Sequence, residues 1–208
     1  MLAARAALAS LCLAACTRVG TPPERRPPLF TDSFDRAELG PDWLATAPVY
    51  RIEKGELVVK GARNHPLWLK RELPDDAVIE LDAWSADPAG DLKVEAWGDG
   101  KSHAQSLEYT STGYVLIHGG WHNRVTALCR MEEHGHDRRT RTDMPVERGR
   151  RYHWLIARRG GRLEWFIDGK LALDLNDPQP LTGPGHRHFA FDDCEAELHF
   201  DNLVIRPN

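Results

Sequence analysis

The chain has 208 residues, and its 27 lysines and arginines are outnumbered by 31 aspartates and glutamates, which gives a formal net charge of −4. This acidic balance argues against a nucleic-acid partner, because binding to the phosphate backbone needs a basic footprint. Residues 29–208 have the length of one domain, since a β-sandwich of this size is usually not split. The paired arginines are interpreted as solvated strand ends and turns: Arg138-Arg139, Arg150-Arg151 and Arg158-Arg159.

The first residues have the pattern of an export signal. One positive charge, Arg5, precedes an apolar run from Ala6 to Ala15, which is too short to cross a bilayer because a spanning helix needs about 20 apolar residues. The segment Leu13-Ala14-Ala15-Cys16 resembles the bacterial lipobox, in which the cysteine is acylated and becomes the first mature residue. We therefore predict a signal peptide at 1–15 and a lipid on Cys16. The alternative is a plain secretory signal or an N-terminal anchor helix.

The next segment, residues 16–28, is rich in proline and arginine and has no apolar period. Its proline pairs predict an extended tether that holds the domain off the membrane. Thr17 follows the lipidated cysteine, and by resemblance to lipoproteins of diderm bacteria the lack of aspartate there implies the outer membrane. The predicted location is extracytoplasmic and lipid-anchored, with the membrane as a partner through Cys16.

Two cysteines, Cys129 and Cys194, remain in the domain. A disulfide between them is allowed outside the cytosol, but framework disulfides usually come in larger sets. The sequence therefore leaves their pairing open. No CxxC motif occurs, so there is no zinc-ribbon or redox signature.

Short runs of alternating apolar and polar residues follow the tether, and no helical period is evident. Tight hairpins are expected at Lys54-Gly55, Gly160-Gly161 and Asp168-Gly169, because X-Gly pairs supply the positive φ that such turns need. More than ten strands in one domain predict two packed sheets. The expected strands are Tyr50–Glu53, Glu56–Lys60, Leu67–Arg71, Ala77–Ser85, Asp91–Trp97, Gln105–Tyr109, Tyr114–His118, Arg124–Met131, Arg151–Arg159, Arg162–Ile167, Lys170–Leu175, His188–Phe191 and Ala196–Arg206.

Three groups of segments carry a resemblance to a known superfamily. They are an opening group (Asp32–Arg36, Leu39-Gly40, Trp43 and Tyr50–Leu57), a late pair with its turn (Tyr152–Arg158, Arg162–Phe166 and Asp168-Gly169-Lys170) and a closing strand (Phe200–Ile205). Together they resemble the concanavalin A-like lectin and glucanase jelly rolls, in which the closing strand pairs with the opening one. The resemblance implies an all-β, two-sheet β-sandwich and a glycan or polysaccharide partner. The superfamily includes lectins, laminin G-like modules, glycoside hydrolases and lyases, so the fold does not fix the activity.

Alternation within the expected strands separates apolar from polar faces. Glu80, Asp82 and Trp84 share one face of their run, and Lys93, Glu95 and Trp97 share one face of the next. In Tyr114–His118, Val115 and Ile117 oppose the other three residues. In Arg124–Met131 we expect Val125, Ala127, Cys129 and Met131 to be buried and Thr126, Leu128 and Arg130 to face away.

Tryptophan on a polar face indicates a binding groove, because exposed indole carries a hydrophobic cost. In related jelly rolls the concave sheet binds sugar, with aromatic rings against the C–H faces of pyranoses and charged groups on the hydroxyls. The alternative is that Trp84 and Trp97 pack beneath a long loop such as Gly119–Asn123 or His134–Met144. The expected ligand-binding residues are Glu80, Asp82, Trp84, Glu95, Trp97, His118, Trp121 and Arg130.

Glu80-x-Asp82 resembles the start of the Glu-x-Asp-x-x-Glu strand that carries the two catalytic glutamates of laminarinase-like hydrolases. The third position is Ser85, or Ala86 with a one-residue bulge, so the motif is incomplete and we assign no catalytic residue. A second chemistry is proton abstraction beside a carbonyl, with a His or Tyr base and an arginine. The residues that could supply these roles are His118, Tyr109, Arg124 and Arg130.

Metal binding is left open by the sequence. Six histidines lie near predicted turns, but their spacing in the sequence does not match a zinc-binding motif. They are His118, His122, His134, His136, His186 and His188. No cofactor is expected from the residues themselves, and calcium is the one that the resemblance allows, through loop carboxylates such as Asp192, Asp193 or Asp201. The alternative is that these residues are surface histidines and loop acids. The long polar segment His118–Arg141 is either a functional loop or a solvated excursion.

The leading functional hypothesis is a membrane-anchored, lectin-like carbohydrate-binding module on the extracytoplasmic side. The first alternative is a glycan lyase or glycosidase that uses the same groove. The second is a non-catalytic structural or adhesion domain without a sugar site. Exposure of Trp84 and Trp97 beside the paired acids favours the first two hypotheses, and burial of both favours the third.

Overall fold

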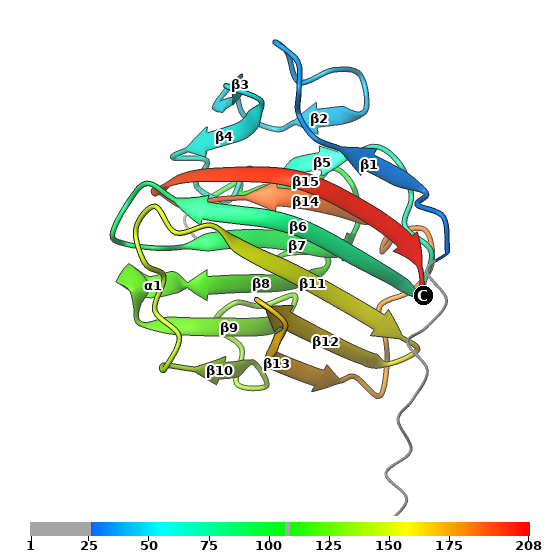
Figure 1. Ribbon diagram of the computed structural model, residues 1–208. Helices are drawn as coiled ribbons and strands as arrows, with labels where there is room; N and C mark the ends of the chain where they lie inside the picture. The colour runs from blue at the N-terminus through cyan, green and yellow to red at the C-terminus, as the bar shows by residue number, and fades with distance from the viewer. Residues whose placement is uncertain (1–25, 107–108) are drawn as a thin grey trace, which may run out of the picture.

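The computed structural model describes residues 26–106 and 109–208, which form an all-β sandwich of two antiparallel sheets (Figure 1). This confirms the fold class predicted from the strand pattern. The predicted signal peptide at 1–15, the lipid site at Cys16 and most of the tether lie outside the described residues. Within the described part of the chain, no helix has the length and apolar character needed to cross a membrane.

Sheet A contains eight of the described strands, all antiparallel, and the twist of its long strands is visible in Figure 1. The strand β1 lies beside β15, outside the main order of the sheet. The order across the sheet is β13 (Lys170–Asn176), β12 (Arg162–Ile167), β11 (Tyr152–Arg159), β6 (Ala77–Ser85), β15 (Glu197–Pro207), β4 (Glu56–Lys60) and β3 (Tyr50–Glu53), with β1 (Phe30–Asp32) at the side.

Sheet B contains seven of the described strands and packs against sheet A. A four-residue turn of helix, α1 (Gly120–Asn123), connects β8 to β9. The order across the sheet is β10 (Arg139–Arg141), β9 (Val125–Arg130), β8 (Tyr114–Gly119), β7 (Leu92–Gly98), β14 (His188–Asp192), β5 (Leu67–Leu69) and β2 (Trp43–Ala45).

The connections confirm most of the strand prediction. The opening strand pairs with the closing one, with Phe30 opposite Ile205. The predicted turn at Lys54-Gly55 has φ of 53° and 79° at its two residues, the left-handed geometry that two-residue hairpins require. The expected strand Gln105–Tyr109 is wrong, because none of its described residues is in a strand. The short strands β1, β2 and β10 are not among the strands expected from alternation.

The main core lies between the sheets and is made of apolar side chains that alternate along the strands. From sheet A, Trp154 and Trp165 are fully buried, with ring centres 4.6 Å apart at 61°. From sheet B, Val94, Leu116 and Phe189 close the other side of this core. Each large side chain buried in this way contributes about 1.5–3 kcal/mol of hydrophobic stabilisation.

Sheet B is unusual because its outer face, the face turned away from sheet A, is also covered. All seven residues of β7 and all six of β8 are buried, whereas one face of an antiparallel sheet is commonly solvated. The outer side chains of β8 and β9 form a second apolar cluster of Val115, Ile117, Ala127 and Cys129.

This second cluster corrects the expected orientation of β9. Leu128 belongs to the main core, and Ala127 and Cys129 face outward beneath the covering segments. Alternation could not decide between the two orientations, because apolar side chains occupy both phases of this strand. The two cysteines are unpaired in the structure: Cys129 is buried and Cys194 is exposed.

Candidate functional site

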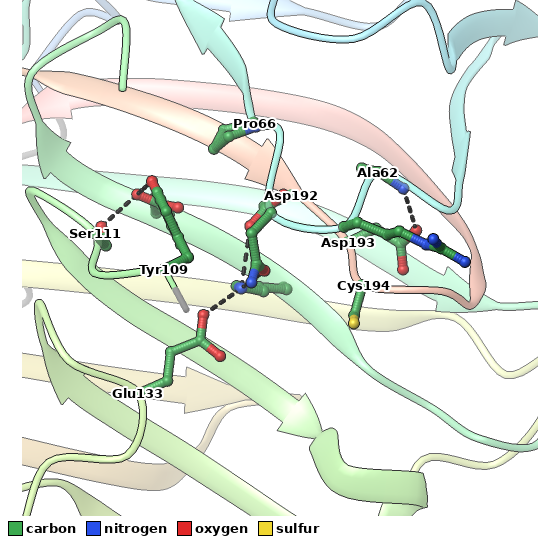
Figure 2. Close-up of polar contacts among 12 residues, drawn as sticks. Ala62, Pro66, Tyr109, Ser111, Glu133, Asp192, Asp193 and Cys194 are labelled. Atoms are coloured by element: carbon green, nitrogen blue, oxygen red, sulfur yellow. Dashed lines mark hydrogen bonds and ion pairs between the residues drawn. The ribbon is translucent and has the colours of Figure 1, made fainter. Parts of the chain in front are cut away.

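Three connections cover the outer face of sheet B: those between β4 and β5, between β7 and β8, and between β9 and β10. Each places a polar side chain on the strand β7. Asn64 comes from the first, Ser111 from the second and Glu133 from the third. Figure 2 shows Ser111, Glu133 and Asp192 converging on this face from different parts of the fold. We call the group formed by Asp91, Lys93, Glu95, Glu133, Asp192 and Asp193 the lysine–carboxylate cluster.

Lys93 is at the centre of this cluster and is only 1% exposed. Its direct partner across the β7–β14 pair is Asp192, so both side chains stand on the same face of the sheet. The Lys93 ammonium forms an ion pair with Glu133, donates to Asn64 Oδ1 at 2.6 Å and lies 3.1 Å from Asp192 Oδ2. Burial opposes its charge, but attraction by Asp192, Glu133 and Glu95 outweighs burial and holds the Lys93 pKa well above its usual range.

Glu95 stands two residues along the same face of β7 and is completely buried. Its Oε2 accepts hydrogen bonds from the hydroxyls of Tyr109, at 3.3 Å, and Ser111, while Oε1 has no partner. Burial raises the pKa of Glu95 to about 8, and the nearby charge of Asp192 adds to the shift. Glu95 therefore keeps its proton at neutral pH and has an O–H to donate.

Two further carboxyl groups extend the cluster past the end of β14. Asp193 Oδ2 accepts from the backbone N–H groups of Gly61, at 2.6 Å, and Ala62, at 3.1 Å. Asp91 Oδ2 accepts from the backbone N–H of Cys194 at 3.3 Å. Burial raises the pKa of both Asp91 and Asp193 to about 7. At neutral pH the cluster thus holds a mixture of protonated and ionised carboxyl groups around one ammonium.

Such an arrangement can bind hydroxyl groups and exchange protons with them. Ionised carboxylates accept hydrogen bonds, and a neutral carboxylic acid donates one, so both kinds of partner for a hydroxyl are present. A carboxyl group that keeps its proton at neutral pH is also what general acid catalysis requires. Glu95 itself is covered, and the partly exposed groups through which the network reaches the surface are Tyr109 and Glu133.

Aromatic and cationic side chains border the cluster. Trp121, in α1, is partly exposed and packs against the outer apolar cluster. The His134 ring lies 5.7 Å from it, and the Arg138 guanidinium lies 5.0 Å from its ring centre. Arg138 also donates to the backbone oxygen of Glu133 at 2.7 Å, which connects this rim to the lysine–carboxylate cluster.

The first three predicted ligand-binding residues lie on the outer face of sheet A, on β6. Glu80 pairs with Arg206, and Asp82 Oδ1 lies 2.9 Å from His153 Nδ1. Trp84 is only partly exposed because it stacks on His199, with ring centres 3.6 Å apart at 20°. These residues form a separate network that shares no contact with Glu95.

Two more predicted residues, Trp97 and His118, are buried between the sheets. Trp97 is fully buried, and its Nε1 donates to the backbone oxygen of Pro74 at 3.0 Å. Its φ is 57°, and the pairing of β7 with β14 skips it, so Trp97 is the extra residue of a β-bulge that turns its ring inward. His118 is 1% exposed, and burial lowers its pKa to about 4, which keeps the ring neutral.

The remaining predicted residues, Arg130 and Trp121, lie on opposite sides of sheet B. Arg130 donates to Asp177 Oδ2 at 2.9 Å, on the side of the sheet that faces the main core, whereas Trp121 stays beside the lysine–carboxylate cluster. The single groove expected from the sequence is therefore corrected: of the eight residues, the outer face of sheet B holds Glu95 and Trp121. Lys93, Asn64 and Glu133 were not expected there, although Lys93 and Glu95 alternate with Leu92, Val94 and Ala96 in the sequence.

The three aspartates considered as calcium ligands have separate partners in the structure. Asp192 pairs with Lys93, and Asp193 accepts from backbone N–H groups, whereas Asp201 lies on sheet A and accepts from Arg151 at 3.1 Å. Across residues 26–106 and 109–208, no group of three or more His, Cys, Asp or Glu side chains is arranged to hold a metal ion. These three aspartates therefore do not share one site.

Comparison with known proteins finds solved structures of similar fold. No protein-family model and no curated relative matches the sequence. The solved structures that resemble it include the carbohydrate-binding module CBM66 from Bacillus subtilis, at 13% identity and a TM-score of 0.58 over 79% of this chain and 95% of that one. A laminarinase from Flavobacterium sp. UMI-01 matches at 11% identity and a TM-score of 0.59 over 86% of this chain and 99% of that one.

The domain has the fold of a concanavalin A-like jelly roll. A glycosyl hydrolase family protein from Mycobacterium fortuitum has a similar fold, with 15% identity and a TM-score of 0.58 over 87% of this chain and 100% of that one. At these identities the likeness establishes the fold of the jelly roll and leaves its activity to be argued from its own side chains.

Proposed function

We propose that the jelly roll binds a carbohydrate on the outer face of sheet B, at the surface of the lysine–carboxylate cluster. The observation that carries this proposal is the buried row of Lys93, Glu95 and Asp192 on a sheet face that would ordinarily be solvated. Burying charged groups costs free energy, and a purely structural cover could have been apolar. The row instead leads to the surface through Tyr109 and Glu133.

The chemistry of the rim fits a sugar. The hydroxyls of a pyranose both donate and accept hydrogen bonds, and Glu133, Asn64 and the Tyr109 hydroxyl offer both kinds of partner. Trp121 presents an indole on the same side, and aromatic rings pack against the apolar C–H face of pyranoses. The carbohydrate-related names of similarly folded structures, among them CBM66 and the laminarinase, also support a glycan partner.

A glycan-array screen of the purified protein tests the proposal. We expect binding to at least one class of polysaccharide or oligosaccharide, unchanged by EDTA because the described residues assemble no metal site. Binding that disappears with EDTA would show that a metal completes the site. Failure to bind any glycan would contradict the proposal and favour a structural or adhesion domain.

A second candidate function, a glycan-active enzyme, is favoured by one observation. Glu95 has a pKa of about 8 and carries its proton at neutral pH, as a general acid must. Analysis of any bound glycan for new reducing ends or unsaturated sugars decides between binding and turnover. Loss of such products in Glu95→Gln, with binding retained, would show that turnover depends on the carboxyl group of Glu95.

We also propose that a lipid on Cys16 anchors the domain on the extracytoplasmic side, at the outer membrane of a diderm host. The lipobox-like segment and the proline-rich tether support this arrangement. Expressed in a diderm host, the protein should fractionate with the outer membrane, and mass spectrometry should find a mature chain beginning at an acylated Cys16. Cys16→Ser should abolish the lipid and release the protein from the membrane; a soluble wild-type protein would contradict the proposal.

A further inference from the structure

Arg158 is a buried arginine at one end of the sandwich, far in sequence from the lysine–carboxylate cluster. On β11 it continues the inward-facing row of Tyr152, Trp154 and Ile156, and it is 1% exposed. This corrects its interpretation as a solvated strand end. Its guanidinium lies 5.0 Å from the ring centre of Trp97 and 5.7 Å from that of Tyr114.

The charge of Arg158 has no counterion in the described part of the chain. Its Nε donates to the backbone oxygen of Gly160 at 3.2 Å, and its buried Nη1 has no hydrogen-bond partner. No carboxylate of a described residue lies within 4.0 Å of it. Burying an unpaired guanidinium charge costs free energy. The contacts with the faces of Trp97 and Tyr114 offset only part of this cost.

Arg158 lines a pocket of about 470 Å³ that opens to the surface. The pocket lies at the end of the sandwich where β6 begins and where β11 and β15 end, near the point marked C in Figure 1. Its volume falls within the range of small-molecule sites. It shares no residue with the lysine–carboxylate cluster. Its other walls include two aspartates and a second arginine beside prolines and a threonine: Arg26, Pro74, Asp75, Asp76, Pro180 and Thr182.

We propose that this pocket binds a carboxylate with a neutral, hydroxyl-bearing body, the chemistry of a sugar acid. The planar guanidinium matches a carboxylate in shape, and its charge has no carboxylate partner among the described residues. Asp75 and Asp76 also line the pocket, so they oppose a second negative charge and disfavour a phosphate dianion. The same acids and Thr182 can bind hydroxyls, while the prolines offer apolar surface for C–H groups.

Thermal unfolding of the purified protein with added D-glucuronate tests this inference. A ligand that binds only the folded state raises the melting temperature with its concentration. We expect D-glucuronate to raise it, D-glucose to have no effect, and inorganic phosphate to have a weaker effect than D-glucuronate. An equal response to glucose, or a larger response to phosphate, would overturn the inference, as would no response to D-glucuronate.

Two variants separate binding from folding. Arg158→Met keeps the volume but removes the charge, and it should weaken D-glucuronate binding by at least about tenfold in isothermal titration. Thr182→Trp fills the exposed mouth of the pocket and leaves Arg158 in place, so it should also abolish binding. If Arg158→Met does not fold, Thr182→Trp alone decides. A folded form of either variant that binds D-glucuronate like the wild type would overturn the inference.

Discussion

Lys93→Met should destabilise the protein by about 3–5 kcal/mol at neutral pH, the typical cost of removing one partner from a buried ion pair. Lys93 is the ammonium against which both Asp192 and Glu133 are paired, and Asp192 is fully buried. Asp192 Oδ1 has no hydrogen-bond partner, so little else stabilises its charge. Urea unfolding followed by tryptophan fluorescence measures the loss as a lower midpoint at an unchanged slope.

Lys170→Met is the matched control, since Lys170 is exposed at the start of β13. We expect its unfolding free energy to stay within about 0.5 kcal/mol of the wild type. Adding Asp192→Asn to Lys93→Met should recover part of the lost stability, because it removes the carboxylate that Lys93 had paired with. If Lys93→Met lowers the unfolding free energy no more than Lys170→Met does, the ion pairs of Lys93 do not stabilise the fold.

The unfolding free energy should fall between about pH 6.5 and pH 8, and Glu95→Gln should reduce this fall. Glu95 has a folded pKa of about 8 against an ordinary value of 4.5, so the folded state binds the proton more tightly than the unfolded state. Its contribution is fully present below pH 4.5 and is lost as the pH rises through about 8. The slope for one such group approaches about 1.4 kcal/mol per pH unit.

Three other groups with shifted pKa values also make the unfolding free energy depend on pH. Asp91 and Asp193, with pKa values of about 7, act in the same direction as Glu95 up to neutral pH. His118 acts in the opposite direction, because its folded pKa is about 4 against an ordinary 6.5, so its contribution to stability grows as the pH rises between these values. The opposing effect of His118 is half complete at pH 6.5 and nearly complete at about pH 7.5, above which the raised pKa values of the acids determine the slope.

Urea unfolding at several pH values between about 6.5 and 8 measures this slope for the wild type, Glu95→Gln and a control. Glu38→Gln serves as the control because Glu38 is exposed, and it should keep the wild-type slope. A wild-type stability that is constant or rises over this interval would contradict the assignment of a protonated Glu95. The same conclusion would follow if Glu95→Gln kept the full slope.

The two-sheet fold was predictable because its determinants are local. Strict alternation marks β6 and β11, and the X-Gly pairs at Lys54-Gly55 and Gly160-Gly161 lie where the structure places hairpins. The expected pairing of the first and last strands also holds. The short edge strands β1, β2 and β10, of three residues each, are too brief to show a period.

The site was harder to predict because it depends on long-range pairing. Glu80 and Glu95 look alike in the sequence, but β6 joins sheet A and β7 joins sheet B, which places the two on opposite sides of the sandwich. A single bulge turns Trp97 inward against the alternation of its strand. Lys93 becomes part of a cluster only once β14 lies beside β7 and three connections cover both.

The measurement that tests the central claim most directly is the affinity of the best-bound glycan for variants on the two outer faces. Trp121→Ala and Tyr109→Phe alter the surface of the lysine–carboxylate cluster, and His153→Ala alters the outer face of sheet A. We expect Trp121→Ala to weaken binding about tenfold and Tyr109→Phe to weaken it severalfold, with His153→Ala binding like the wild type. Loss of binding in His153→Ala, with Trp121→Ala and Tyr109→Phe unchanged, would place the glycan on sheet A and contradict the account.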